Sequence, residues 1–418
     1  MSAAGVMGVG DVTGIQRGSQ TAVDFVKTFN NELGLSKDAI KEKDAHMASN
    51  ASHFMTAMPA LFYKDVRGPF AAESQLRAAP SPAGLLVGDA HLGNLMTHTG
   101  PEGKTVWGWS DCDKAGVGKL EWDLDRLAAH TVISARLADK SFSKDDQKDL
   151  VAALSAGYTG QMRQFAESGA RPEGFLRRNE TDGALASFIK TANDPSQRDL
   201  IKKLAPGGSF NPSLKESSPD AAAIRAGVVE YASRLSADAA IAQPVKILSL
   251  AIGDPSVGGS NSGLVKYLAL VAPRDPNDPP VSLKFKQVLP SAPANGTGTL
   301  SQADAARVVE NAAVLTGVRN PLVGYATVEG HSCLVEPEQA NSAILDPQNL
   351  SKKDFLALAR AAGEALARSQ LQSPSLSREQ ISSWLGDPST DDAATRQLHH
   401  FAVDYADQTQ ADAAALKN

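Results

Sequence analysis

The chain has 418 residues, of which 42% are hydrophobic and 21% are charged, a composition typical of a globular protein with two or three domain-sized units. Its formal net charge is -6, and no run of Lys or Arg is long enough to follow a phosphate backbone, which argues against nucleic acid as the main partner. No stretch of about 18 apolar residues is present, so no membrane span is expected.

The cysteine content and the N-terminal segment bear on the compartment. Cys112 and Cys333 are too few for a disulfide framework and favour a reducing environment. The N-terminal segment lacks a basic region followed by an apolar one, so it does not resemble a secretory signal. We therefore expect a cytoplasmic protein, and export by a route that uses no cleavable signal stays open.

The first predicted elements are a helix and two short strands. Residues 1–20 are rich in Gly, Ser and Ala, which indicates a loose leader before a helical pattern. After a break at SPAG, the apolar run Leu85–Val87 predicts a strand that ends at Gly88. The turn sequence PEG precedes Thr105–Trp109, which predicts the next strand. A helical pattern then runs from Trp122 to about Leu137.

Helical patterns also fill the stretches 143–245 and 351–418, the first with an interruption at Pro206–Ser213. Four helix starts carry a Ser followed three residues later by Asp or Gln, so that each side chain can bind the other residue's backbone amide. These pairs are Ser143 with Asp146, Ser301 with Asp304, Ser351 with Asp354, and Ser377 with Gln380.

The character of the sequence changes near residue 246. The runs VKILSLAIGD and LVKYLALVA are of strand type, and Val281–Leu289 alternates as a half-buried strand does. A helix from Ser301 and two further strands in YATVEGHSCLVE follow. The sequence therefore predicts an α+β protein with a five-strand block between helical segments.

Two acidic clusters follow the first two predicted strands. The sequence VGDAHLGNL carries Asp89 and Asn94, and SDCDKAGVGK carries Asp111 and Asp113. Loops at the ends of adjacent strands can converge on one point. Phosphoryl transfer needs a carboxylate that orients the attacking group and oxygen ligands for magnesium. We therefore take Asp89, Asn94 and Asp111 as candidate catalytic residues, and Asn94, Asp111 and Asp113 as candidate magnesium ligands.

The spacing D-x-x-x-x-N from Asp89 to Asn94 is that of the kinase catalytic loop. Asp, Gly and Asn are also the commonest turn residues, so either cluster alone is compatible with a plain turn. The presence of both, each after a strand, favours a site. For His91 we favour a role in holding the loop over metal binding or proton transfer. Cys112 lies between two acids that would raise its pKa, which indicates a packing residue.

The strand-rich block carries a third candidate site feature, a glycine-rich turn followed by a strand lysine. The segment between its first two strands contains Gly253, Gly258, Gly259, Ser260 and Gly263, and such a turn lets backbone amides approach phosphate closely. Glycine turns are also common hairpin connections. Lys286 lies on the next strand and Glu310 on the next helix, as in kinases, where this pair grips phosphates. Lys284 shares the face of Lys286, and periodicity does not separate the two.

Several segments of the chain share their pattern with one bacterial family. They are LFYKD (Leu61–Asp65), GDAHLGN (Gly88–Asn94), SDCD with EWDLDRLAA (Ser110–Ala129), SVGGSNS (Ser256–Ser262), LKFKQVLPS (Leu283–Ser291), RVVEN (Arg307–Asn311) and YADQTQAD (Tyr405–Asp412). The chain thereby resembles, from about residue 45, the family catalogued as domain of unknown function 2252, which is grouped with protein-kinase-like and aminoglycoside-phosphotransferase-like folds.

The resemblance implies a role for each matching residue. Asp89 would be the catalytic base, Asn94 and Asp111 the magnesium ligands, and Lys286, in preference to Lys284, the phosphate-binding lysine with Glu310 as its partner. Asp123 and Arg126 would tie their helix to the loops. Gly258, Gly259 and Ser260 would contact the nucleotide, and the implied cofactors are ATP and magnesium.

The chain departs from the family pattern at several charged positions. An Arg-Gly pair is replaced by residues of the run Met55–Ala57, and a Glu by Gln287. An Arg-Gln pair is replaced by Glu336-Pro337, an acidic residue by Lys114, and a His by Gln370. These changes bear on the substrate class and on activity.

The order of the parts predicts a circularly permuted, two-lobe, protein-kinase-like fold. The catalytic loop precedes the lysine here, whereas in kinases it follows, and permutation is tolerated where the original termini lie close together. We expect a leader and first helix at 1–45, a helical lobe with the catalytic loops at 46–245, a small nucleotide-binding β lobe at 246–340, and completing helices at 341–418.

The expected function is ATP- and magnesium-dependent phosphoryl transfer to an unidentified hydroxyl acceptor. A pseudokinase that binds nucleotide without turnover and an AMP transferase are the alternatives, since kinase-like sites mostly position phosphates. A two-metal phosphoesterase is a further rival because GDAH resembles such a motif, but the additional His and Asn ligands that it needs are missing. The stretch 143–245 is a candidate acceptor surface or a scaffold insertion. The sequence does not give the oligomeric state.

Overall fold

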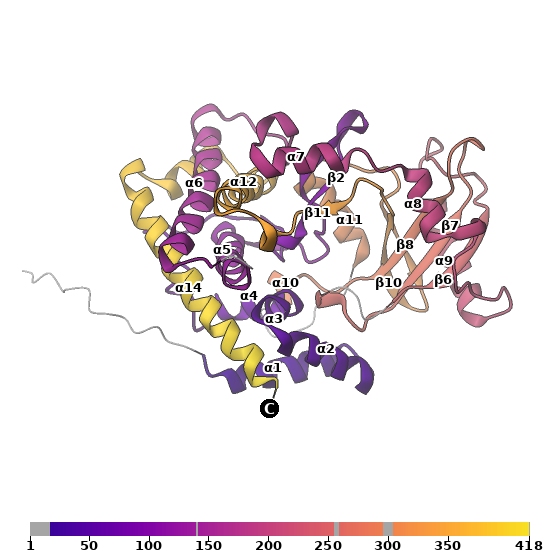
Figure 1. The fold of residues 1–418 in the computed structure, drawn as a ribbon, viewed down its shortest axis with the longest axis horizontal. Helices are drawn as coiled ribbons and strands as arrows, with labels where there is room; N and C mark the ends of the chain where they lie inside the picture. The colour runs from indigo at the N-terminus through magenta and orange to yellow at the C-terminus, as the bar shows by residue number, and fades with distance from the viewer. Residues whose placement is uncertain (1–16, 139–140, 255–258, 296–303, 418) are drawn as a thin grey trace, which may run out of the picture.

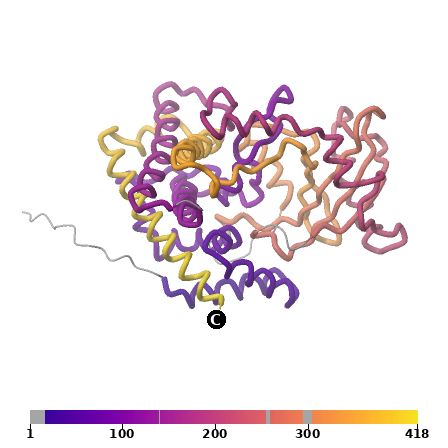
Figure 2. Tube along the Cα trace, in the orientation of Figure 1, coloured from indigo at the N-terminus to yellow at the C-terminus, as the bar shows by residue number. Residues whose placement is uncertain are grey.

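The computed structural model describes residues 17–138, 141–254, 259–295 and 304–417. A helix-rich part and a separate antiparallel sheet lie side by side, on the left and right of Figure 1 respectively. The predicted α+β class is confirmed. Both chain ends contribute to the helix-rich part, as the indigo and yellow segments of the tube in Figure 2 show.

The helix-rich part is built from the first seven and the last three α-helices. They are α1 (Ser19–Glu32), α2 (Lys37–Ser49), α3 (Ala51–Ala57), α4 (Pro59–Asp65), α5 (Leu120–Leu137), α6 (Lys144–Ser168), α7 (Gly183–Ala192), α12 (Lys352–Gln370), α13 (Arg378–Leu385) and α14 (Asp391–Ala415). Apolar side chains from most of these helices form one large buried cluster, and α5 runs through its middle, buried from Leu120 to Ala135.

The predicted capping pairs start several of these helices. Ser143 and Ser377 each form the full reciprocal pair with the residue three positions on. The Ser351 hydroxyl accepts a hydrogen bond from the backbone amide of Asp354 at 3.1 Å. Ser301 lies outside the described residues, and the helix predicted there begins after Asp304, whose own side chain caps it.

Two small sheets carry the acidic loops. The first pairs β1 (Ala83–Leu86) with β4 (Gly116–Lys119), and the second has the order β11 (Ala343–Ile344), β2 (Leu95–Thr99), β3 (Thr105–Trp109), β5 (Phe175–Leu176). The two strands predicted before the acidic clusters are present as β1 and β3. They lie in different sheets, so the expectation that they are adjacent strands was wrong.

The predicted five-strand block is confirmed as one antiparallel sheet. Its order is β6 (Ile247–Ile252), β7 (Lys266–Val271), β8 (Val281–Gln287), β10 (His331–Pro337), β9 (Gly324–Val328). Period-two alternation gives it one face of apolar residues such as Phe285 and Val335, which pack on α9 (Pro219–Ser233). The opposite face carries Lys266, Lys284 and Lys286.

Two helices cover parts of the lysine-bearing face. Val308 and Val309 of α11 (Ala305–Thr316) pack against Leu334. Ile201 of α8 (Gln197–Leu204) packs near Leu270. The structure thus places α8 and α9, which belong to the stretch 143–245, against the five-stranded sheet.

The remaining helical segments are short. They are η1 (Leu92–Asn94), η2 (Pro101–Gly103), η3 (Arg178–Glu180), η4 (Pro206–Gly208), η5 (Gly259–Asn261), α10 (Ala292–Asn295), η6 (Pro347–Asn349) and η7 (Pro388–Thr390). Across the described ranges, no helix combines the length and the apolar character needed to cross a membrane.

Candidate active site

A β-hairpin brings the first two candidate residues together. Strands β2 and β3 are antiparallel, and Leu95 at the start of β2 is the partner of Trp109 at the end of β3. Asn94 comes just before this pair and Asp111 two residues after it, so both lie at the same end of the hairpin. The backbone amide of Ser110 donates to the carbonyl of Asn94 at 3.2 Å, which fixes the two loops to each other.

The loop with Asp89 folds back onto the same point. Gly88 has φ +81°, and a Cβ there would lie 2.0 Å from the carbonyl oxygen of Lys114, so only glycine allows this close approach. The Asn94 side-chain amide donates to the carbonyl of Asp89 at 3.0 Å. The early acidic loops therefore converge, although their strands belong to different sheets.

Helix α5 contacts this loop through Asp123 and Arg126, the two residues that were expected to tie the helix to the loops. Asp123 accepts a hydrogen bond from the amide of Val87 at 2.7 Å, and Arg126 donates from Nε to Oδ1 of Asp89 at 3.1 Å. Burial raises the pKa of Asp89, and Arg126 opposes that shift. Oδ2 of Asp89 faces Nε2 of His91 at 3.8 Å.

His91 forms a hydrogen bond within its own loop and Cys112 is buried, as the interpretations that we favoured predict. Nδ1 of His91 accepts from the amide of Gly93 at 3.1 Å. Burial, aided by Arg126, lowers the pKa of His91 to about 3, so the ring is neutral at pH 7. Cys112 is buried, and burial together with the flanking carboxylates raises its pKa well above the usual value.

Lys286 on β8 reaches the acidic loops from the other part of the molecule. Its Nζ lies 3.6 Å from Oδ2 of Asp111 and 3.1 Å from Oε2 of Glu336, and its side chain is 12% exposed. Burial opposes the charge, but the surrounding carboxylates outweigh it and raise the pKa of Lys286. Lys284 pairs with Glu338 at 3.5 Å.

The predicted partnership of Lys286 with Glu310 was wrong. Glu310 does not line the pocket of Lys286 and forms an exposed ion pair with Arg319 at 2.7 Å. Glu336 lies beside Lys286 instead, because β10 is the neighbouring strand of β8. The sequence had marked Glu336 only as part of the pair Glu336-Pro337, which departs from the family pattern.

Both carboxylate oxygens of Asp113, a predicted metal ligand, accept hydrogen bonds from side chains. Lys114 Nζ donates to its Oδ1 at 2.8 Å, and Asn261 Nδ2 donates to its Oδ2 at 2.6 Å. Burial opposes ionisation of Asp113, but Lys114 and Lys286 outweigh it and hold the pKa below the usual value. Sequence reasoning missed Asn261 because its partners lie in a distant loop.

One pocket of about 510 Å³ collects most of the predicted residues. The candidates that line it are Asp89, Asn94, Asp111, Asp113, Gly259, Ser260 and Lys286. Gly258 lies outside the described residues. Lys286 and the residues Gly259 and Ser260 are encoded far from the acidic loops, yet all of them line this pocket.

Asp111 and Asn94 are suitable ligands for a magnesium ion whose remaining ligands come from a bound phosphate and from water. Oδ1 of Asp111 is buried and has no hydrogen-bond partner, although 36% of the side chain is exposed. Burial and the nearby Asp113 raise the pKa of Asp111, and Lys286 opposes them. Within the described residues, no group of three or more His, Cys, Asp or Glu could hold a metal alone. Phosphate oxygens and water would supply the rest.

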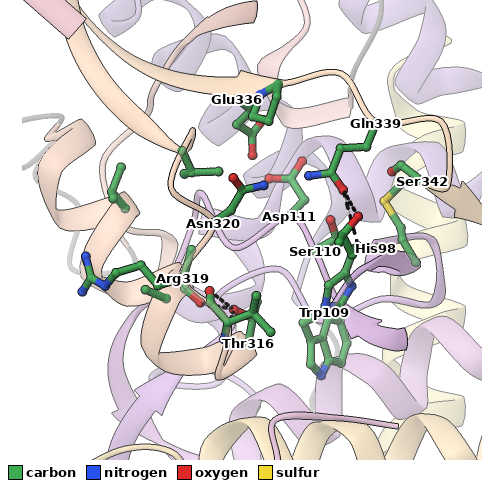
Figure 3. A pocket seen from close by; sticks show the side chains of 18 of the residues that line it. His98, Trp109, Ser110, Asp111, Thr316, Arg319, Asn320, Glu336, Gln339 and Ser342 are labelled. Atoms are coloured by element: carbon green, nitrogen blue, oxygen red, sulfur yellow. Dashed lines mark hydrogen bonds between the residues drawn. The ribbon is translucent and has the colours of Figure 1, made fainter. Parts of the chain in front are cut away.

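A second pocket, of about 210 Å³, is also lined by Lys286. It shares Asp111, Lys284, Lys286 and Glu338 with the first pocket, so the two are parts of one cleft. Figure 3 shows Asp111 near its centre, with Glu336 from the sheet above it and Trp109 on the far side from Arg319. The indole Nε1 of Trp109 is buried without a hydrogen-bond partner in the described part of the chain.

The fold and the site together define an α+β protein in which two acidic loops, a glycine segment and a strand lysine share one cleft. Residues 35–418 match the family described as an uncharacterized protein conserved in bacteria (DUF2252), and the chain belongs to this family. Among curated proteins and among solved structures, none matches the chain.

Proposed function

We propose that this protein is an ATP- and magnesium-dependent phosphotransferase that acts on a hydroxyl acceptor. The observation that carries the proposal is the convergence of Asp111 and Lys286, with 3.6 Å between Oδ2 and Nζ, in a pocket that also holds Asp89 and Asn94. A carboxylate, an amide, a second carboxylate and a lysine are the side chains that phosphoryl transfer from ATP uses.

Each side chain has one task in this proposal. Lys286 binds the α- and β-phosphates, for which it would leave Glu336, and Asn94 and Asp111 hold the cation, which neutralises charge on the transferring group. Asp89 orients the acceptor hydroxyl and takes its proton through Oδ2, since Arg126 occupies Oδ1. The acceptor oxygen bonds to the γ-phosphorus as the bond from that atom to the β–γ bridging oxygen breaks, and ADP leaves.

The proposed fold is a protein-kinase-like one with permuted lobes. In support, the glycine segment joins the first two strands of the five-stranded sheet and Lys286 lies on the third, which is where kinases carry these features. The acidic loops flank a hairpin in the helix-rich part. The contact between the two chain ends supplies the junction that permutation needs.

The decisive experiment measures turnover with ATP labelled at the γ- or the α-phosphate, with magnesium and candidate acceptors. Label transferred only from the γ-position supports the proposal, whereas transfer from the α-position would identify an AMP transferase. The Asp111→Ala variant should lose turnover on the order of 10²–10³-fold, because the cation loses a ligand. It should melt near the wild-type temperature, because Lys286 keeps Glu336 as partner.

A nucleotide-binding module without turnover is the second candidate, and two contacts favour it. Arg126 donates from both Nε and Nη2 to Oδ1 of Asp89, which weakens that carboxylate as a base, and Glu336 competes for Lys286. Calorimetry with a non-hydrolysable ATP analogue and magnesium separates the two candidates. Binding without transfer of either label to any acceptor would favour the binding module, and the absence of binding would remove both.

A further inference from the structure

Lys114 follows the second acidic cluster and is buried inside the protein. Its side chain is 2% exposed, and its Nζ lies 2.8 Å from Oδ1 of Asp113 and 2.7 Å from Oδ1 of Asn261. The ammonium group therefore bridges the acidic loop of the helix-rich part and the glycine segment next to the five-stranded sheet. A carboxylate oxygen and an amide oxygen are also the types of ligand that a magnesium ion takes from a protein.

The three side chains form a closed ring of hydrogen bonds. Asn261 completes it by donating from Nδ2 to Oδ2 of Asp113 at 2.6 Å. Each oxygen of Asp113 thus has a donor, whereas Oδ1 of Asp111 has none within the described residues. The two aspartates are two positions apart in the chain, yet within the described residues only Asp111 has a buried oxygen without a hydrogen-bond partner.

The surroundings of Asp113 are already rich in positive charge. Lys286 and Lys114 both act on it electrostatically. Lys43 on α2 is completely buried, close enough to Lys114 for repulsion, and its Nζ has no hydrogen-bond partner in the described part of the chain. A divalent ion next to Asp113 would meet these ammonium groups in a medium that screens charge weakly.

We propose that the ammonium group of Lys114 takes the place of a second divalent cation, so that the site holds one metal ion, at Asn94 and Asp111. The inference rests on the proposed function, because it presupposes that a cation and a nucleotide enter the cleft. Asp113 then acts as a positioning residue that joins the acidic loop to the glycine segment through Lys114 and Asn261. One cation with the fixed charges of Lys114 and Lys286 would balance the phosphates.

The test counts bound Mn²⁺ by electron paramagnetic resonance, with a saturating non-hydrolysable ATP analogue and the full chain. We expect one Mn²⁺ per chain in the wild-type protein, one in Asp113→Asn and none held tightly in Asp111→Asn. Lys114→Met should bind two, since it frees Oδ1 of Asp113 and Oδ1 of Asn261. Lys104→Met is the matched control because Lys104 is an exposed lysine away from the site, and it should bind one.

The outcomes separate this inference from the proposed function. Two Mn²⁺ per chain in the wild type, loss of Mn²⁺ in Asp113→Asn, or a single Mn²⁺ in a folded Lys114→Met would each overturn the inference and leave the function standing. Failure of the wild type to bind the analogue and Mn²⁺ at all would overturn both. Thermal melting shows whether Lys114→Met folds, and if it does not, the count in Asp113→Asn decides.

Discussion

Asp111 and Asp113 show what a sequence can and cannot reveal about single residues. Their type and their place after a strand predicted that both would lie in a polar cleft, and both line it. The two residues differ in their hydrogen-bond partners, which local sequence patterns do not reveal. Asn261 lies in the glycine segment, and its contact with Asp113 exists only because the two parts of the molecule pack together.

The choice between Lys286 and Lys284 gives a prediction with a control on the same strand. Lys286→Met should weaken binding of ATP and magnesium about 10–100-fold, since a charge-assisted hydrogen bond contributes about 1.5–3 kcal/mol. Lys284→Met should weaken it less, because Lys284 pairs with Glu338 and its side chain is more exposed. Calorimetry measures both, and equal losses would contradict the assignment.

Glu121 gives a prediction about pH and stability. Its side chain is 1% exposed, and burial raises its pKa to about 7, against hydrogen bonding from Leu76 and the charge of Lys119. A carboxyl group with a raised pKa in the folded state binds a proton more tightly there. Its contribution is complete below the unfolded pKa of about 4.3 and is lost as the pH rises through about 7.

The full loss amounts to about 4 kcal/mol, because the two pKa values differ by about 2.7 units and each pKa unit corresponds to about 1.4 kcal/mol. The variant Glu121→Gln should lack this pH dependence and should be the more stable protein at pH 8. Urea denaturation of both proteins at pH 5 and pH 8 measures the difference. An equal change for the two proteins between these pH values would show that Glu121 is not its source.

At the scale of elements, the strength of the local pattern decided what could be predicted. Strand β7 lies in an apolar run of strand type, β8 alternates, and Gly- or Pro-rich segments bound them, so their existence followed from the sequence. β2 was missed, and β5 has only two residues. The hairpin that places Asn94 beside Asp111 therefore appears only in the structure, although the convergence itself was expected.

The crossing of α6 and α12 depends on glycine. A Cβ at Gly363 would lie 2.0 Å from the carbonyl oxygen of Leu154, and one at Gly157 would lie 2.1 Å from that of Arg360. We expect Gly363→Ala to lower the free energy of unfolding by about 1–3 kcal/mol, because overpacking forces the helices apart.

Gly160 on α6 is the matched control for this change, since nothing lies within 4 Å of a Cβ there. Gly160→Ala should raise the free energy of unfolding by about 0.5–1 kcal/mol through helix propensity. Chemical denaturation measures both variants. A stabilising Gly363→Ala would mean that the two helices can separate without loss.

At the scale of the whole molecule, the sequence predicted a strand-rich block between helical segments, and the structure contains one. The strand-rich block was recognised because hydrophobic periodicity changes near residue 246. That α8 and α9 pack on this sheet could not be read from the sequence, because an amphipathic helix does not specify which apolar surface it covers. Tertiary packing alone makes that choice.

Arg17 ties the two ends of the chain together. It donates to Asp65 of α4 at 2.9 Å and to Asp412 of α14 at 2.6 Å, and all three side chains are buried. Arg17→Met should lower the free energy of unfolding by about 3–5 kcal/mol, since it leaves two buried carboxyl groups without their cation.

The exposed pair of Arg319 with Glu310 provides the comparison for Arg17. Arg319→Met should change stability by less than about 1 kcal/mol, because exposed ion pairs contribute little. Denaturant titrations of the two variants test the difference. Similar small effects would show that the buried cluster does not hold the chain ends.

The large apolar cluster that α5 and α6 share with α12 and α14 has a consequence for biosynthesis. Ribosomes add roughly 5–20 residues per second, so α5 and α6 emerge many seconds before the helices that cover them. During that interval the apolar faces that pack on α12 and α14 have no native partner, and Lys286 is not yet opposite Asp111. The cleft can therefore form only after Lys286 has been synthesised, and the helical core can close only after α14 has left the ribosome.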